Sequence, residues 1–213
     1  MKYKYFLVFA LAFAMTMGEI HAQTVRIYKK EELAPLMRYT KLKTAFEAAT
    51  FVQRFDLSLH ELITLEGEFN KFTECVELNI NENKLSTLPV SIGDMKKLQY
   101  FWALHNLLTA LPQSIGNCEY MQEMDVSFNQ IMRLPEGICK LKDLKIFRAN
   151  SNQLQSMPED IGDLTQLKEL NLGINAIQFF PDSFINLKSL EILVLSHNYF
   201  ARLPDSISKL ENV

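Results

Sequence analysis

The chain of 213 residues contains few of the residue types on which several protein classes depend. It holds three cysteines, four histidines and seven glycines, and its 22 basic residues do not outnumber its 25 acidic ones. A small, odd cysteine count excludes a disulfide-rich scaffold, and seven glycines are too few for collagen or for several phosphate-binding loops. A net charge of −3 argues against a nucleic-acid-binding protein, which would carry a basic surface.

A long hydrophobic run is also missing. The most apolar stretch, residues 5–17, is 13 residues long, whereas a membrane-spanning helix needs about 20. Two lysines precede this stretch and small residues follow it, which is the pattern of a secretory signal peptide. We expect residues 1–22 to be removed by cleavage after Ala22, with cleavage after Gly18 as the alternative. The mature chain from Gln23 is then secreted (extracellular, periplasmic or at the cell surface), with no membrane span.

Prolines are scarce too, and six of the seven are evenly spaced along the chain. Successive members lie 23 residues apart, at Pro89, Pro112, Pro135, Pro158, Pro181 and Pro204. A fixed period of this length indicates a repeat architecture. On this period residues 52–213 divide into seven units, which begin at 52, 75, 98, 121, 144, 167 and 190. Val213 is left over and would begin an eighth unit.

Each unit reads L-x-x-L-x-L-x-x-N-x-L-x-x-L-P-x-x-I-G-x-L-x-x, and seven of its positions are apolar in every unit. The fourth and sixth positions lie on the same face of a strand, so strands of successive units can stack about 4.8 Å apart in a parallel sheet. Proline fixes φ and needs no hydrogen-bond partner, which suits the returning half of the unit. We expect an α/β solenoid: an arc with a parallel β-sheet on the concave face and short helical or irregular convex segments.

The ninth position is asparagine in six of the units. These residues are Asn83, Asn106, Asn129, Asn152, Asn175 and Asn198. A buried amide carries both donors and acceptors, so it can bond the backbone groups that a sharp turn removes from the sheet. We therefore expect these residues to form a structural asparagine ladder.

These motifs resemble the leucine-rich repeats. The 23-residue form with Leu-Pro-x-x-Ile-Gly is similar to repeats of plant intracellular Ras-group proteins and of many bacterial secreted proteins. The resemblance covers residues 52–212 and implies the solenoid fold, but its motifs do not specify a function. The first unit departs from the pattern, with His60 for the asparagine and Glu66 for the proline, as in a capping repeat. Among the later units, the glycine is replaced by Cys139, Ile185 and Ser208.

The two ends of the solenoid differ. Residues 23–51 are expected to form an N-terminal cap, in which Thr40 begins a helix over 41–50 with apolar residues at i, i+3, i+4 and i+7. No corresponding cap follows the last unit, so the strand around Leu193 and Leu195 is expected to have an unpaired edge. A partner would cover this edge, a second copy would associate with it edge to edge, or the chain is truncated.

The sequence predicts no catalytic, metal-binding or cofactor-binding constellation. His21 lies in the expected signal peptide and the other three histidines are spread along the solenoid. No phosphate-, zinc- or calcium-binding motif occurs. Gly93, Gly116 and Gly162 fall at repeat positions, where we expect turns and not a phosphate-binding nest. The cysteines are expected to be buried thiols, and a disulfide between Cys118 and Cys139 is the less favoured alternative.

The concave face carries the candidate partner-binding surface, and it includes the only tryptophan of the chain. Aromatic residues and arginine are enriched at interface hot spots, and an apolar cluster with a charged rim marks a contact site. The alternative is that aromatic residues merely favour strands. The candidate residues are Tyr100, Trp102, Leu104, Asp125, Phe128, Ile146 and Arg148.

These patterns favour a secreted, non-catalytic module that recognises a protein partner, and no nucleic acid, through its concave face. Two alternatives stay open. Some bacterial proteins that the chain resembles carry a catalytic domain after the repeats, so the chain would be the recognition part of a larger effector enzyme. A surface adhesin or glycan binder would also use an aromatic platform.

Overall fold

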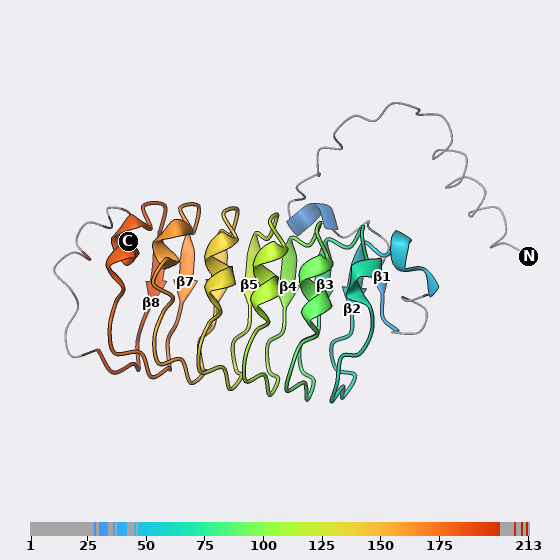
Figure 1. Cartoon of the computed structure of the whole chain (residues 1–213), viewed down its shortest axis with the longest axis horizontal. Helices are drawn as coiled ribbons and strands as arrows, with labels where there is room; N and C mark the ends of the chain where they lie inside the picture. The colour runs from blue at the N-terminus through green and yellow to red at the C-terminus, as the bar shows by residue number, and fades with distance from the viewer. Residues whose placement is uncertain are drawn as a thin grey trace, which may run out of the picture.

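The computed structural model describes residues 28, 30–33, 36, 38–41, 45, 47–200, 207, 210 and 212. Within these ranges the chain forms an arc of stacked turns (Figure 1). The expected signal peptide and its cleavage site lie outside the described residues. In the part that is described, no helix has the length and hydrophobicity needed to cross a membrane.

Eight short strands of the described part form one parallel sheet, in the order in which they occur along the chain. They are β1 (Arg38–Tyr39), β2 (Arg54–Asp56), β3 (Glu77–Asn79), β4 (Tyr100–Trp102), β5 (Glu123–Asp125), β6 (Ile146–Arg148), β7 (Glu169–Asn171) and β8 (Ile192–Val194). From β2 to β8 each residue pairs with the residue 23 positions further on, as Glu77 does with Tyr100. The sheet therefore confirms the expected solenoid.

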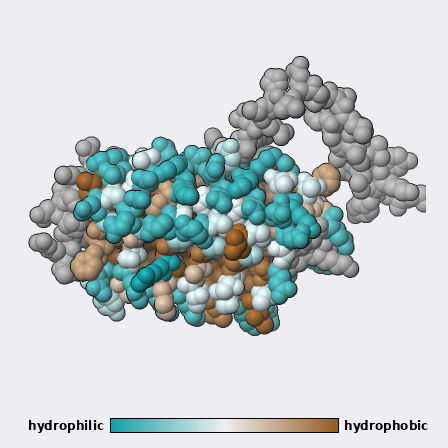
Figure 2. Space-filling view, in the orientation of Figure 1, coloured by the Kyte–Doolittle hydropathy of each residue, from teal (hydrophilic) through white to brown (hydrophobic). Residues whose placement is uncertain are grey.

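Short 3-10 helices (η) form the other half of the units, on the convex side of the arc (Figure 1). Those of the repeats are η3 (Phe69–Lys71), η4 (Val90–Asp94), η5 (Gln113–Asn117), η6 (Glu136–Lys140), η7 (Ile161–Asp163) and η8 (Asp182–Asn186). Proline immediately precedes η4, η5, η6 and η8 with φ between −70° and −66°, the range that its ring imposes. Hydrophilic residues gather along the upper part of the face in Figure 2, and hydrophobic ones lie in separate groups lower down.

The core lies between the strands and the η helices. The fourth-position side chains of the first six units have no exposed surface: Phe55, Leu78, Phe101, Met124, Phe147 and Leu170. Each layer is covered by the layers on either side, so the units stabilise one another by stacking. Leu193, the equivalent residue in β8, is only partly buried because β8 has a strand neighbour on one side alone in the described part.

The three glycines of the Ile-Gly motif that were expected in turns lie in helices instead. Gly93, Gly116 and Gly162 belong to η4, η5 and η7 respectively. At each of them a Cβ atom would meet the backbone of the next unit, whose carbonyl oxygen approaches closely. At these three positions the contact between neighbouring helices therefore requires glycine.

The turn after each strand from β2 to β8 contains a residue in the left-handed conformation, immediately before the ninth position. These residues have φ between 52° and 61°: Leu59, Glu82, His105, Phe128, Ser151, Ile174 and His197. Glycine adopts this region at least cost, and a β-branched residue such as Ile174 is unusual there. Since none of the seven is glycine, other contacts of the turn must hold the backbone in this conformation.

The region before the first unit contains more than the expected helical cap. Ala45 and Glu47 are helical, Ala45 is fully buried, and its backbone N–H donates to the Lys41 carbonyl at 3.0 Å. Residues 42–44 and 46 lie outside the described residues, and η2 (Ala49–Phe51) follows. A turn of helix therefore lies within the expected range 41–50.

The strand β1 was not expected from the sequence. It pairs in parallel with β2, Arg38 opposite Arg54, and the Arg38 guanidinium forms an ion pair with Asp56. The edge of β2 is thereby covered, which removes an open template for further strand pairing. Two residues are too few to show a period, so the sequence carried no signal for this strand.

Candidate functional site

The asparagine column joins adjacent units by hydrogen bonds, and Asn129 shows the arrangement. Its Nδ2 donates to the carbonyls of Ala103, Val126 and Ser127 at 2.9, 3.0 and 3.1 Å. Its Oδ1 accepts the backbone N–H of Leu108 at 2.9 Å. Equivalent bonds are made by Asn83, Asn106, Asn152, Asn175 and Asn198. These amides form hydrogen bonds within the solenoid, so they are not part of a ligand-binding surface.

The concave face is partly occupied by the chain's own N-terminal residues. We call residues 28 and 30–33 the N-terminal strap; its η1 helix (Lys30–Leu33) lies at the edge of the arc above β3 and β4 (Figure 1). The Tyr28 N–H donates to Gln99 Oε1 at 2.8 Å, and the Tyr100 hydroxyl donates to the Tyr28 carbonyl at 2.7 Å. Arg54 donates to the Leu33 carbonyl at 3.1 Å. The strap thus crosses the strands and is bonded to several units.

The strap buries a residue that was expected to be exposed. Tyr100 is only 5% exposed, because it packs against Leu33 and Val76 in a small apolar cluster with Trp102 at its border. Burial raises the pKa of the Tyr100 phenol to about 12, and the Glu123 carboxylate adds to this shift. The expectation that Tyr100 belongs to an open surface is corrected, since the strap covers it.

Glu123 is the charged centre of this region, and the sequence pattern did not single it out. Its side chain is 6% exposed, and its Oε1 accepts the Trp102 indole N–H at 3.0 Å. The Lys30 ammonium lies 3.1 and 3.2 Å from its two oxygens and 5.0 Å from the Trp102 ring centroid, within the range of a cation–π interaction. Arg148 contacts Glu123 at 3.4 Å and forms a two-point pair with Glu169 at 2.6 and 2.7 Å.

The other candidate residues lie around this centre with different exposure. Phe128 is 44% exposed and its ring stacks on that of His105, with centroids 4.3 Å apart. Leu104, Asp125 and Ile146 are half-buried. The part of the predicted surface that is open to a partner therefore centres on Phe128, beyond the strap.

The three cysteines are free and buried, so the disulfide between Cys118 and Cys139 is not formed. The Cys118 thiol is directed instead to the Ile92 carbonyl, at 3.5 Å. Burial raises the pKa of the Cys118 and Cys139 thiols to about 12 and also raises that of Cys75. These groups stay protonated at neutral pH, which makes them poor nucleophiles.

Buried thiols give a testable prediction about reactivity and pH. We expect almost no reaction of the native protein with a thiol reagent near pH 8, and three reactive thiols once it is unfolded without a reductant. The unfolded thiols lose their protons near pH 8.5, whereas the folded ones keep them until about pH 12. The free energy of unfolding should therefore fall as the pH rises above about 8.5. Thiol titration and urea unfolding at several pH values measure both effects.

The alanine variant of Cys139 serves as the control for this pH dependence. Its free energy of unfolding should fall less steeply above about pH 8.5, because one thiol no longer contributes. Fewer than three thiols in the unfolded, unreduced wild type would contradict the free state of the cysteines.

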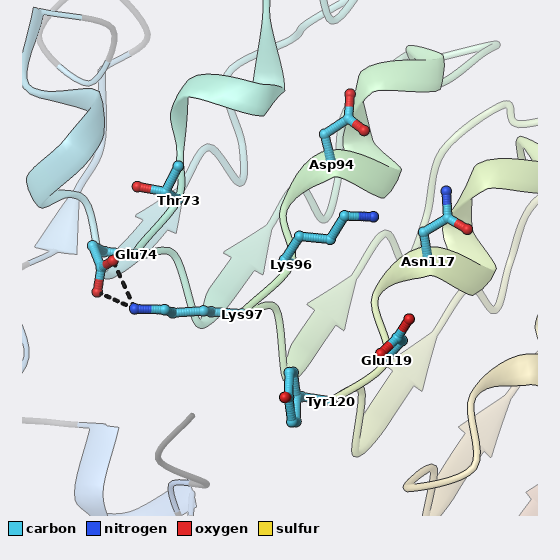
Figure 3. Close-up of a pocket in the computed structure, with 8 residues that line it drawn as sticks. All are labelled: Thr73, Glu74, Asp94, Lys96, Lys97, Asn117, Glu119 and Tyr120. Atoms are coloured by element: carbon cyan, nitrogen blue, oxygen red, sulfur yellow. Dashed lines mark hydrogen bonds and ion pairs between the residues drawn. The ribbon is translucent and has the colours of Figure 1, made fainter. Parts of the chain in front are cut away.

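A second feature of the surface is a shallow hollow of about 480 Å³ where the η helices lead into the strands (Figure 3). It is lined by Thr73, Glu74, Asp94, Lys96, Lys97, Asn117, Glu119 and Tyr120. The Lys97 ammonium lies 2.7 and 2.8 Å from the Glu74 carboxylate, and that of Lys96 donates to the Gly93 carbonyl at 3.1 Å. Its two lysines are thus engaged by neighbouring groups. Among the described residues, no three His, Cys, Asp or Glu side chains are grouped as metal ligands.

Comparisons with known proteins agree with the repeat geometry. The family described as "Leucine-rich repeat region" matches residues 89–178, and "Leucine Rich Repeat" matches residues 189–210. The chain is a leucine-rich-repeat protein. No curated protein matches its sequence.

Two solved structures resemble this leucine-rich-repeat protein. One is a leucine-rich-repeat protein of Leptospira interrogans, 23% identical with a TM-score of 0.50 over 83% of this chain and 68% of that chain. The other is TLR13 in its complex with ssRNA13, 25% identical with a TM-score of 0.66 over 76% of this chain. The match spans 24% of the TLR13 chain. Both likenesses support the leucine-rich-repeat fold.

Proposed function

We propose that this leucine-rich-repeat protein is a secreted, non-catalytic recognition module that binds a protein partner through its concave face. Its repeats are assigned to the 23-residue class with Leu-Pro-x-x-Ile-Gly. The observation that carries the proposal is the exposed Phe128, which stacks on His105 and belongs to the same repeat unit as the charged Glu123. A rigid aromatic with a polar rim supplies the apolar contact area on which hot spots depend.

The charges of the face favour a protein over a nucleic acid as partner. TLR13 is described in complex with a single-stranded RNA, and binding of that kind needs cations that can neutralise phosphates. Here the net charge is −3, and the arginines of β2 and β6 are engaged by glutamates. Arg54 pairs with Glu77 at 3.0 Å and Arg148 pairs with Glu169 at 2.6 Å.

Replacing Phe128 by alanine should weaken partner binding by about tenfold or more, as removal of an aromatic anchor at an interface does. The substitution keeps the left-handed turn at φ 54° available at similar cost, because both residues carry a Cβ atom. Protein exported from the full coding sequence is immobilised and exposed to its native surroundings. Captured partners are identified by mass spectrometry, and their affinities are then measured with purified protein.

The matched control is Val90→Ala, which removes an exposed apolar side chain (72%) from η4 on the convex side. Both variants should unfold at nearly the wild-type urea concentration. Equal recovery of every partner by the wild type and Phe128→Ala would rule out the proposed surface.

A further inference from the structure

The N-terminal strap is held in the way that a receptor holds a peptide. Two of its contacts engage the main chain of Tyr28. Gln99, which has no exposed surface, accepts the Tyr28 N–H at 2.8 Å, and Tyr100 donates to the Tyr28 carbonyl at 2.7 Å. Further along, Arg54 donates to the Leu33 carbonyl at 3.1 Å. Such main-chain bonds can be made to a segment from any chain.

Two side chains of the strap supply the contacts that depend on sequence. In a 3-10 helix residues i and i+3 are eclipsed, so Lys30 and Leu33 of η1 project on one side, toward the sheet. Leu33 is 2% exposed in the apolar cluster with Val76. The Lys30 ammonium contacts both oxygens of Glu123 and lies over the Trp102 ring. The residues between them, Glu31 and Glu32, are exposed.

The residues that contact the strap belong to the sheet and are held by other residues of the sheet, whereas the strap is a separate segment. Glu123 is 6% exposed and is held by the Trp102 indole at 3.0 Å and by Arg148 at 3.4 Å, which are contacts independent of the strap. Lys30 keeps 58% of its side chain exposed. The carboxylate would therefore stay in place and compensated when Lys30 leaves, which is what exchange of one occupant for another requires.

We propose that the concave face around Gln99, Trp102 and Glu123 binds a peptide segment of a partner protein that presents Lys-x-x-Leu in one helical turn. The strap occupies this site when no partner is bound. This inference rests on the proposed function and specifies the chemistry of the partner. Because the strap is tethered, its effective concentration at the site is high, on the order of millimolar, and a free peptide competes poorly with it.

Fluorescence of Trp102 reports on the site directly, because this is the only tryptophan of the chain. The probe is a synthetic peptide of residues 26–34, which contains the Lys-x-x-Leu pattern and no tryptophan. It is titrated into protein expressed from the full coding sequence. The variant Lys30→Ala/Leu33→Ala, which weakens the strap, should bind the peptide at least tenfold more tightly than the wild type. Adding Glu123→Gln to that variant should weaken binding at least tenfold.

Two controls separate the site from a general effect of charge or folding. Lys140→Ala removes an exposed lysine of η6 and should leave peptide binding as in the wild type. A peptide with alanine in place of its Lys30 should bind the opened variant at least tenfold more weakly. Urea unfolding of each variant verifies that it is folded.

The inference is overturned if the opened variant does not bind the peptide, or binds it equally well with Glu123→Gln. It is also overturned if the wild type binds as tightly as the opened variant, because the strap then does not occupy the site. Phe128 lies outside the strap contacts, so its alanine variant tests the proposed function separately. Failure of the peptide together with loss of a partner by Phe128→Ala would overturn this inference alone.

Discussion

Replacing Asn129 by alanine is expected to lower the free energy of unfolding by roughly 3–5 kcal/mol. The buried Leu108 N–H is left without a partner, at about 1–3 kcal/mol, and three carbonyls each lose one of two donors, at about 0.5–1.5 kcal/mol per bond. The Leu108 N–H loses its acceptor, and the carbonyls of Ala103, Val126 and Ser127 lose a donor. The side chain is only 8% exposed, so water cannot easily replace it. Urea unfolding followed by circular dichroism measures the change.

Asn129→Asp separates hydrogen bonding from size. Aspartate can still accept the Leu108 N–H, but its charged form cannot donate to the three carbonyls. It should be at least as destabilising as alanine at pH 7. The loss in free energy of unfolding relative to the wild type should become smaller as the pH falls and the carboxyl group is protonated. Gln130→Ala, at an exposed neighbouring position, should change stability by less than about 0.5 kcal/mol. A near-wild-type stability of Asn129→Asp at pH 7 would contradict the bonding scheme.

Replacing Gly116 by alanine is expected to destabilise the protein by about 3 kcal/mol or more, although alanine is normally the better helix residue. A Cβ atom at this position would lie 2.6 Å from the Gly137 carbonyl carbon, 2.9 Å from its Cα and nearer still to its oxygen. These are backbone atoms of the next unit, so they cannot rotate away as a side chain would. The two units must separate locally, and the effect is read from the urea midpoint.

Gly173→Ala is the matched control for this substitution. Its Cβ would lie 3.3–3.4 Å from the nearest atoms, all of which belong to the side chains of Val194, Asn171 and Ser196. These side chains can adjust, so we expect a change of less than about 1 kcal/mol. If Gly116→Ala were as stable as the wild type, the close contact between η5 and η6 would be wrong.

The fold was predictable because a solenoid is stabilised by contacts between neighbouring units. The apolar residues Leu78 and Ile80 need only match the equivalent residues one period away, and that match is visible in the sequence. The turn backbone was less predictable. Ile174 and Phe128 adopt a positive φ without being glycine, because the adjacent asparagine bonds the carbonyls of the turn.

The candidate site was predicted only in part, and Tyr100 and Glu123 show why. Both lie at the third position of their units, whose side chains leave the sheet on the concave side. The repeat pattern alone therefore predicts that they are exposed. Their burial depends on Tyr28 and Lys30, which precede the repeats by tens of residues and follow no period. An acidic residue one strand from the single tryptophan was the one signal that could have drawn attention to Glu123.

By itself the sequence determined the 23-residue period, the parallel strands, the convex returns and the positions of the asparagine ladder, because each depends on a local pattern repeated at fixed spacing. Only the tertiary structure decided which part of the concave face is open. It placed β1 beside β2 and the strap over Tyr100, and it paired Arg54 and Arg148 with glutamates. These contacts join segments that do not follow the repeat period. Their energies therefore depend on which side chains the tertiary structure brings into contact.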